Sequence, residues 1–336
     1  MYSWSDDTSD WYGKGSYGYG EKGKDERDAA SRRAAAAGPR SYERRGGPNP
    51  ALIDPHKRVE SASKNPLIVA VDVTGSMANW PFEIFDRLPL LYNTLSQYRE
   101  DVEVCFAAIG DASADRWPLQ VTEFAKGYDL EQQLGALYGE GGGGDAPESY
   151  GLFAWWVEHH VKVPNAETPF LIVFGDAPMH PRTPGDQLQR VLGDSPEGAG
   201  WVEKLMGGGA SDALASWRRI SEAWNVWFLR RPTGRRGDEV DQQWSQAIGA
   251  RKIFHIDDEQ RAVDYAMGLV ARAWGHFADF QKNMLARQDE AKVKSVAERI
   301  RAEGPRVLAC PSCAARIPTE ASGRFTCTFC GSTLEL

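Results

Sequence analysis

Three stretches of this sequence carry oxygen ligands that could together bind a divalent cation. In the first, DVTGS, an apolar run ends in Asp72, and hydroxyl residues follow at every second position, Thr74 and Ser76. The second is the glycine-rich GEGGGGDAPES, with Asp145, and the third is FGDAPMH, with Asp176. Carboxylate and hydroxyl oxygens are hard ligands, which suit Mg²⁺ and, less specifically, Mn²⁺ or Ca²⁺. One Asp alone would be interpreted as a cap or turn residue, but the set predicts a cation site.

A second group of candidate ligands consists of cysteines. Two C-x-x-C pairs, CPSC and CTFC, are separated by thirteen residues and contain Cys310, Cys313, Cys327 and Cys330. Four thiolates at this spacing are typical of a closed, structural zinc ribbon, and about 30 residues need the metal in order to fold. A redox role would require a thioredoxin-like βαβ context, which this stretch lacks. The fifth cysteine, Cys105, lies in an apolar run and is expected to be a buried thiol in a reducing compartment.

The elements that must position these residues alternate between strands and helices. Short apolar runs predict six strands, at 66–73, 102–110, 118–125, 169–176, 225–231 and 252–258. Continuous apolar runs are typical of strands that are buried on both faces, as in a parallel sheet under helices. We therefore predict an α/β fold with a doubly wound, mostly parallel six-stranded sheet. Ligands of such sheets bind at the carboxyl ends of the strands, where the oxygen-bearing stretches fall.

On these residues the chain resembles the von Willebrand factor A-type (vWA) domain over residues 64 to about 280. The pattern Asp72-x-Thr74-x-Ser76 matches that family's metal-ion-dependent adhesion site (MIDAS), usually written D-x-S-x-S, and the other two stretches match its further ligand loops in order. The resemblance implies that Asp72, Thr74 and Ser76 are first-loop ligands and that Asp176 acts through water. It also implies an open metal position for a partner's carboxylate, in a binding module without chemistry of its own.

The second loop departs from the family's common pattern. Many members place Thr after the glycines, whereas this chain has Asp145, with Ser149 as a backup ligand. Three ionised carboxylates around a divalent ion leave a local charge of about −1, which should tighten metal binding and weaken the attraction for a partner's carboxylate. Our hypothesis is that the metal is held constitutively and shapes the loops more than it binds an acidic ligand.

Composition limits the classes of protein to which the chain can belong. The net charge is −8, of which residues 1–65 carry +2, so the remainder is acidic and is poorly suited to bind a phosphate backbone broadly. No run is long enough for a membrane span, and the start MYSWSDDTSD lacks the features of a signal peptide. We therefore expect a cytoplasmic protein. Residues 1–62, rich in Gly, Tyr and Arg, are predicted to be a disordered tail.

The predicted domains are the tail (1–62), the vWA domain (63–285), a helical extension (286–304) and the zinc ribbon (305–336). We expect one long helical element from about Asp258 to Glu303, with the polar stretch RQDEAK inside it. Its second half should project or break, and so carry the ribbon away from the sheet.

These features predict an intracellular scaffold or adaptor that binds a protein partner at its metal face. The alternative is a nucleic-acid-associated factor that uses the ribbon and the basic, aromatic tail. A metal-dependent phosphohydrolase is a weaker alternative. Phosphatases of similar topology have a second Asp where Thr74 stands, and we see no Lys or Arg beside the metal loops. The sequence does not identify the partner or the oligomeric state.

Overall fold

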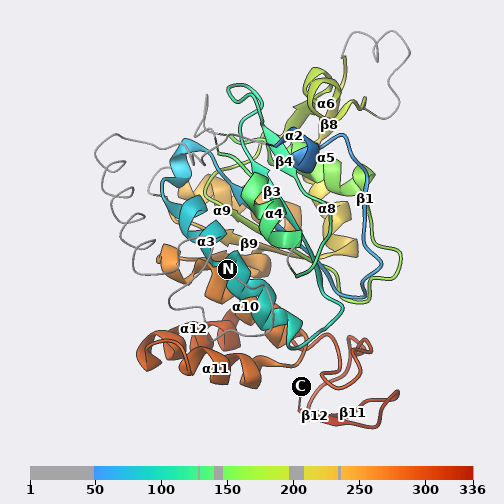
Figure 1. Cartoon of the computed structure of the whole chain (residues 1–336), viewed down its shortest axis with the longest axis vertical. Coiled ribbons are helices and arrows are strands. Elements are labelled where there is room, and N and C mark those ends of the chain that lie inside the picture. The colour runs from blue at the N-terminus through green and yellow to red at the C-terminus, as the bar shows by residue number, and fades with distance from the viewer. Residues whose placement is uncertain (1–48, 128, 140–146, 197–207, 234–235, 336) are drawn as a thin grey trace.

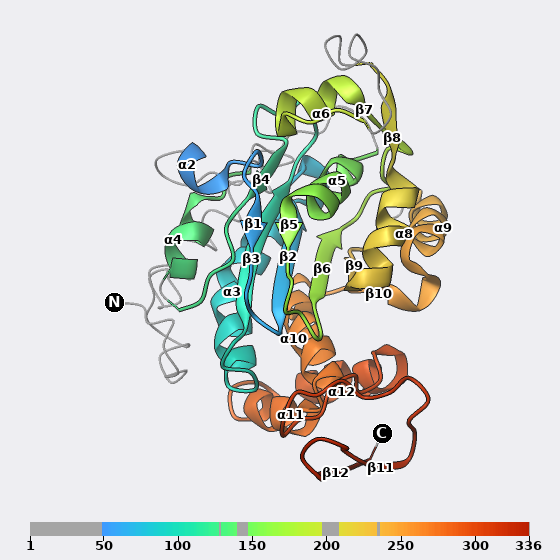
Figure 2. The same cartoon turned by 90° about the vertical axis from the view of Figure 1, so that its right-hand side faces the viewer.

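The computed structural model describes residues 49–127, 129–139, 147–196, 208–233 and 236–335. In this part of the chain, helices cover both faces of one central sheet (Figures 1 and 2). No helix within these ranges is both long and apolar enough to cross a membrane. The arrangement is an α/β fold, as predicted.

All six predicted strands join the central sheet, in the order β10-β9-β6-β2-β3-β4. Their bounds are β2 Pro66–Asp72, β3 Glu103–Ile109, β4 Leu119–Val121, β6 Phe170–Gly175, β9 Asn225–Arg230 and β10 Ile253–His255. All neighbours are parallel except β4, which pairs antiparallel with β3 at one edge and is shorter than the predicted range. The sheet is therefore mixed but mostly parallel.

The sheet separates two apolar cores, as the alternating side chains of β2 show. Val69 and Val71 belong to one core, and Ile68 and Ala70 belong to the other. The first face is covered by α3 Trp80–Ser96, α4 Asp129–Ala136 and α10 Ala262–Ala273, and the second by α5 Tyr150–His160, α8 Ala213–Ala223 and α9 Gly237–Ile248. Burial on both faces explains why the strands are continuously apolar in sequence.

Shorter elements complete the described part of the body. They are α2 Pro50–Ile53, β1 Val59–Glu60, η2 Gly75–Met77, β5 Val161–Lys162, β7 Arg182–Pro184, α6 Gly185–Leu192, β8 Ala210–Asp212, η3 Ala250–Lys252 and η4 Glu259–Arg261. Two-residue β1 pairs with β5, and β7 pairs with β8.

The structure corrects part of the tail prediction. Residues 1–48 lie outside the described residues, but 49–62 form α2 and β1. Ile53 and Val59 are both buried, and β1 is paired with β5. Two apolar side chains and a strand partner are enough to anchor this segment, although its composition predicts disorder.

The structure also corrects the prediction of a single long C-terminal helix. The chain forms α10, then α11 Phe277–Leu285, then α12 Glu290–Glu303. Gly275, at φ +81°, ends the first, and Asp289 caps the third by accepting hydrogen bonds from the amides of Ala291 (3.0 Å) and Lys292 (3.2 Å). The polar stretch RQDEAK therefore contains a turn and a helix start, and α12 folds back beneath the sheet (Figure 2).

Because α12 folds back beneath the sheet, its apolar side chains are buried. Its Val293, Val296 and Ile300 are buried in the same core as α10. The ribbon that follows, with the hairpin β11 Arg324–Thr326 and β12 Thr333–Glu335, lies at the lower end of the molecule in Figure 2. The helix breaks, as one predicted alternative had it, and the segment that leads into the ribbon stays bonded to the end of α10, where the Leu308 amide donates to the Ala273 carbonyl at 2.6 Å.

Candidate functional site

Charged residues follow four neighbouring strands at the carboxyl edge of the sheet. Asp72 ends β2, Asp111 follows β3, and Asp176 follows β6. The next strand, β9, ends in Arg230 and is followed by Arg231, whose amide bonds to the Gly175 carbonyl (2.9 Å). Because these strands are parallel, the sheet brings the four ends to one edge.

The residues predicted from the first and third loops form one hydrogen-bonded chain. Asp72 Oδ1 accepts from the amide (2.9 Å) and hydroxyl (2.6 Å) of Thr74. The Thr74 hydroxyl lies 3.3 Å from that of Ser76, which donates to Asp176 Oδ1 at 2.7 Å. Asp72, Thr74 and Asp176 are buried. The structure therefore brings together four of the predicted site residues.

A tyrosine that sequence reasoning missed fixes the other oxygen of Asp72. The hydroxyl of buried Tyr150, the first residue of α5, donates to Asp72 Oδ2 at 2.5 Å. Burial and the nearby carboxylate of Asp72 raise the pKa of Tyr150 well above its usual value, so the phenol stays a donor. Gly175 makes room for it, since a Cβ at that position would clash with the Tyr150 hydroxyl.

The second loop contributes Glu148, which was also missed. Glu148 is 3% exposed, and among the described residues its Oε2 has no hydrogen-bond partner, while the Thr74 side chain lies close enough to its carboxyl to oppose the rise in its pKa. Burial, followed by the charges of Asp72 and Asp111, raises its pKa to about 10. A bridge to Met179 fixes the main chain of Glu148 beside the third loop. The sequence signal was the glutamate in DAPES, which the structure places just before α5.

The sequence predicted two further ligands in the second loop, Asp145 and the backup ligand Ser149. Asp145 lies outside the described residues. Ser149 is buried, and its hydroxyl accepts a hydrogen bond from the amide of Ala112 at 2.9 Å, so it ties the start of α5 to the loop after β3.

Buried negative charge dominates the electrostatics of the cluster. Burial and then the charge of Asp176 raise the pKa of Asp72 to about 7. Burial also raises the pKa of Asp176, although the Ser76 hydrogen bond and the charge of Arg231 oppose that effect. Buried carboxylates are costly unless a cation or donors compensate them. Carboxylate and hydroxyl oxygens are the types of ligand that a divalent ion takes. Among the described residues, however, the four ribbon cysteines are the one group of three or more His, Cys, Asp or Glu side chains that lies close enough together to hold a metal.

Arg231 corrects the expectation that no Lys or Arg lies beside the metal loops. Its Nη1 lies 3.4 Å from Asp176 Oδ2 and also donates to the main-chain oxygen of Ser76. The guanidinium lies over the ring of Trp80, 6.0 Å from the centroid. The signal in the sequence was the pair RR at the end of the fifth predicted strand (225–231), which only the strand order brings next to Asp176.

The four ribbon cysteines come together as predicted. All four sulfur atoms lie within 4.8 Å of one another, with 3.6 Å between Cys310 and Cys330 and between Cys313 and Cys327. A tetrahedral site with Zn–S bonds of about 2.3 Å needs sulfur atoms about 3.8 Å apart. The cluster therefore fits a zinc ion bound by four thiolates.

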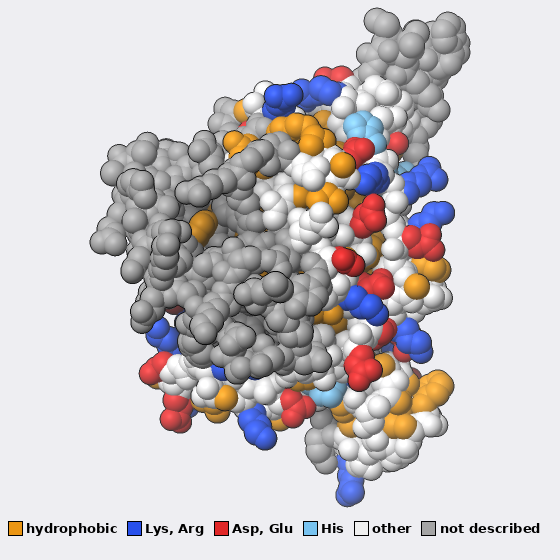
Figure 3. Space-filling view, viewed as in Figure 1, with side chains coloured by type: hydrophobic (Ala, Val, Ile, Leu, Met, Phe, Trp, Pro, Cys, Tyr) orange, Lys and Arg blue, Asp and Glu red, His pale blue; other side chains and the backbone are white. Residues whose placement is uncertain are grey.

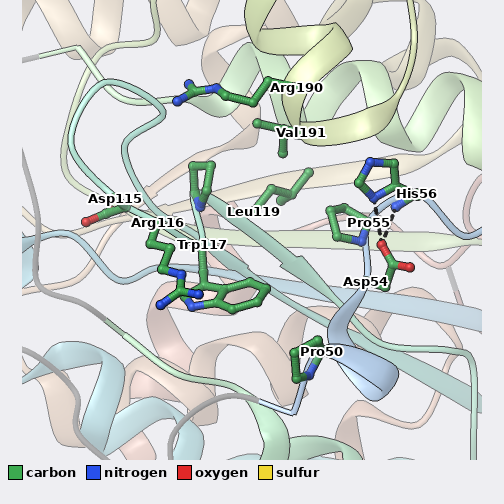
Figure 4. A pocket seen from close by; sticks show the side chains of 11 residues that line it. Pro50, Asp54, Pro55, His56, Asp115, Arg116, Trp117, Leu119, Arg190 and Val191 are labelled. Carbon is green, nitrogen blue, oxygen red and sulfur yellow. Dashed lines mark hydrogen bonds and ion pairs between the residues drawn. The ribbon is translucent and has the colours of Figure 1, made fainter.

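A pocket of about 370 Å³ borders the loop after β3 (Figure 4). Trp117, Leu119 and Val191 give it apolar walls, and Arg116 and His56 lie at its sides. Asp115, which also lines it, accepts a hydrogen bond from the amide of Asp111 at 2.8 Å. The pocket therefore adjoins the loop that carries one of the acidic residues.

Comparisons with known proteins find similarity of fold only. No protein-family model matches the sequence, and no curated protein matches it. The pilus adhesin SpaC from Lactobacillus rhamnosus GG, in its open conformation, matches 68% of this chain and 31% of its own length, at 11% identity and a TM-score of 0.43. Proximal thread matrix protein 1 from the mussel byssus matches 64% of this chain and 48% of its own length, at 12% identity and a TM-score of 0.40. This chain thus spans less than half of either matched structure.

Proposed function

We propose that this chain is a metal-dependent protein-binding module, an intracellular scaffold or adaptor of the vWA type. Asp72, Thr74, Ser76, Asp176 and Glu148 would hold Mg²⁺, or Mn²⁺ or Ca²⁺, at the carboxyl edge of the sheet. The partner would bind at this face, and zinc in the cysteine cluster would be structural. The observation that carries the proposal is the unpartnered, buried oxygen of Glu148 beside a buried carboxylate network.

Binding is favoured over catalysis because the hydroxyls of the site are already engaged with carboxylates. Thr74 donates to Asp72, and Ser76 donates to Asp176. An ion held by those carboxylates would lower their basicity, so neither hydroxyl would be activated as a nucleophile. We propose a cytoplasmic setting because the four clustered thiols suit a reducing compartment.

Arg231 supports metal-dependent phosphohydrolysis as a second candidate, because a guanidinium beside a metal can stabilise a phosphoryl group. Turnover of p-nitrophenyl phosphate with Mg²⁺, lost in Asp72→Ala, would establish that activity. No turnover above that of Asp72→Ala would remove this candidate.

The nucleic-acid alternative has less support. On the face shown in Figure 3, the described Lys and Arg side chains are interspersed with Asp and Glu. A single-stranded or duplex probe that shifts in a salt-sensitive way, and only when residues 305–336 are present, would revive it.

Calorimetric titration with Mg²⁺ tests the proposed cation site. Wild type should bind one ion, and Asp72→Ala should not, while Glu298→Gln, an exposed change on α12, should bind like wild type. Affinity purification with mass spectrometry, comparing wild type and Asp72→Ala, then tests the binding role. A partner list unchanged by Asp72→Ala would move the function away from this face.

A further inference from the structure

We propose that Arg231 is a second cation of this site, which weakens binding of the divalent ion and anchors a carboxylate of the protein partner beside it. This inference rests on the proposed function, because it assigns the kind of group that the metal face selects. It concerns a residue that the ligand pattern of the sequence does not include.

The first support is the position of the guanidinium. The main chain of Arg231 pairs with Gly175, the residue before Asp176, so the side chain starts beside a proposed ligand. Its Nη1 contacts both Asp176 Oδ2 and the main-chain oxygen of Ser76. Trp80, at the start of α3, lies under the guanidinium. Arg231 therefore bridges the first and third loops.

The second support is the unused donor capacity of Arg231. A guanidinium has five N–H donors. Within the described part of the chain, only Nη1 has hydrogen-bond partners, and the side chain is 25% exposed. The remaining donors form a fork that matches the two oxygens of a carboxylate.

Charge balance gives the third support. Asp72, Glu148 and Asp176 with one divalent ion carry a net charge of about −1 when all three are ionised, which repels an acidic partner. Arg231 brings this sum to about zero. Burial raises the pKa of Glu259, on η4, and the charge of Arg231 opposes that rise, so Glu259 also lies near the guanidinium. The guanidinium thus offsets repulsion that the three carboxylates alone would impose on a carboxylate ligand.

Removing Arg231 should strengthen binding of the divalent ion and weaken binding of the partner's carboxylate. Because like charges repel, Arg231→Gln should bind Mg²⁺ about tenfold more tightly than wild type. Arg231→Lys keeps the charge and should stay near wild type. The fork is lost in both variants, so a carboxylate should be held less well in both.

Calorimetric Mg²⁺ titrations in sodium acetate and in sodium chloride of equal ionic strength test both effects, with acetate as the carboxylate probe. By linkage, acetate bound between the metal and Arg231 must tighten Mg²⁺ binding. We expect a several-fold gain in wild type and in Arg251→Gln, an exposed control on η3, and none in Arg231→Gln. Thermal unfolding of each variant checks that it is folded.

The outcomes separate this inference from the proposed function. If Mg²⁺ does not bind to wild type, both the proposed function and this inference are overturned. If Mg²⁺ binds but Arg231→Gln weakens it, or retains the full acetate effect, the inference alone is overturned. Tighter Mg²⁺ binding together with loss of the acetate effect establishes Arg231 as the second cation.

Discussion

Arg99 donates a hydrogen bond from the body of the protein to the main-chain oxygen of Cys310, the first cysteine of the ribbon, at 2.7 Å. The same guanidinium donates to Pro311 O (2.9 Å) and Trp274 O (3.3 Å), and the side chain is buried in the turn after α3. Zinc bound by four thiolates has a net charge of about −2, which a buried cation offsets. The ribbon is therefore attached to the body through its first metal-binding turn.

Replacing Arg99 should destabilise the body and the zinc site together. Arg99→Ala removes the hydrogen bonds that join the body to the ribbon at Cys310 and Pro311, together with the one to Trp274, so we expect a loss of about 3 kcal/mol in the free energy of unfolding. We also expect zinc to be released faster to a chelator, as followed with a colorimetric zinc indicator. Arg251→Ala should change neither quantity. Normal zinc retention by Arg99→Ala would show that the contact only positions the ribbon.

The sequence predicted the sheet because its signals are local and strong. Each of the six strands is an apolar run bounded by turn residues, and the Asp72-x-Thr74-x-Ser76 pattern lies directly at the end of one of them. The cysteine spacing alone defined the metal cluster, because two C-x-x-C pairs leave little choice of geometry.

The features of the site that the sequence did not predict depend on contacts between residues far apart in the chain. Arg231 lies 55 residues from Asp176 in the chain and reaches it only because β9 pairs with β6. Tyr150 lies in a mostly apolar stretch, and its hydroxyl reaches Asp72 only because α5 starts beside the end of β2. The sequence offered a break in the long helix as one alternative but did not place it, because helical propensity continues through RQDEAK, while the tertiary fold and the cap of Asp289 decide where the helix breaks.

Glu148→Gln should weaken Mg²⁺ binding while leaving the metal-free protein nearly as stable as wild type. At neutral pH a carboxyl with a pKa of about 10 is protonated, and the amide of Gln closely resembles it. Binding of a metal ion must expel that proton. Calorimetry in two buffers of different ionisation enthalpy should therefore show about one fewer proton released by the variant. Equal Mg²⁺ affinity and equal proton release in both proteins would exclude Glu148 as a ligand.

Because Tyr150 packs against Gly175, substitutions at the two positions should lower Mg²⁺ affinity and stability to different degrees. Tyr150→Phe removes the hydrogen bond to Asp72, and we expect Mg²⁺ affinity to fall several-fold at a cost of about 1 kcal/mol in stability. Gly175→Ala should be worse on both counts, because its Cβ displaces the whole ring. Urea unfolding and Mg²⁺ titration measure both effects. Gly249→Ala, at a glycine with open space around its Cβ but with φ +95°, controls for backbone strain alone.

Stability of the metal-free protein should fall as the pH rises from 5 to 7. The pKa of Asp72 is raised from its ordinary value of 3.8 to about 7, because burial and the charge of Asp176 disfavour the ionised form. Between those two values the folded state holds a proton that the unfolded state has released. The stability is thus present below the unfolded pKa and is lost as the pH approaches the folded pKa. One such group contributes about 1.4 kcal/mol per pH unit.

Urea unfolding of wild type and Asp72→Asn in the presence of a chelator isolates this contribution from the other titrating groups. The wild-type stability should fall more steeply with pH than that of Asp72→Asn, by about 1.4 kcal/mol per pH unit between pH 5 and 7. Saturating Mg²⁺ should reverse the sign of the difference, because the ion binds the ionised carboxylate and competes with protons for it. Parallel pH profiles of the two proteins without metal would mean that Asp72 ionises normally in the folded state, and that the cluster is less buried and less coupled than the structure shows.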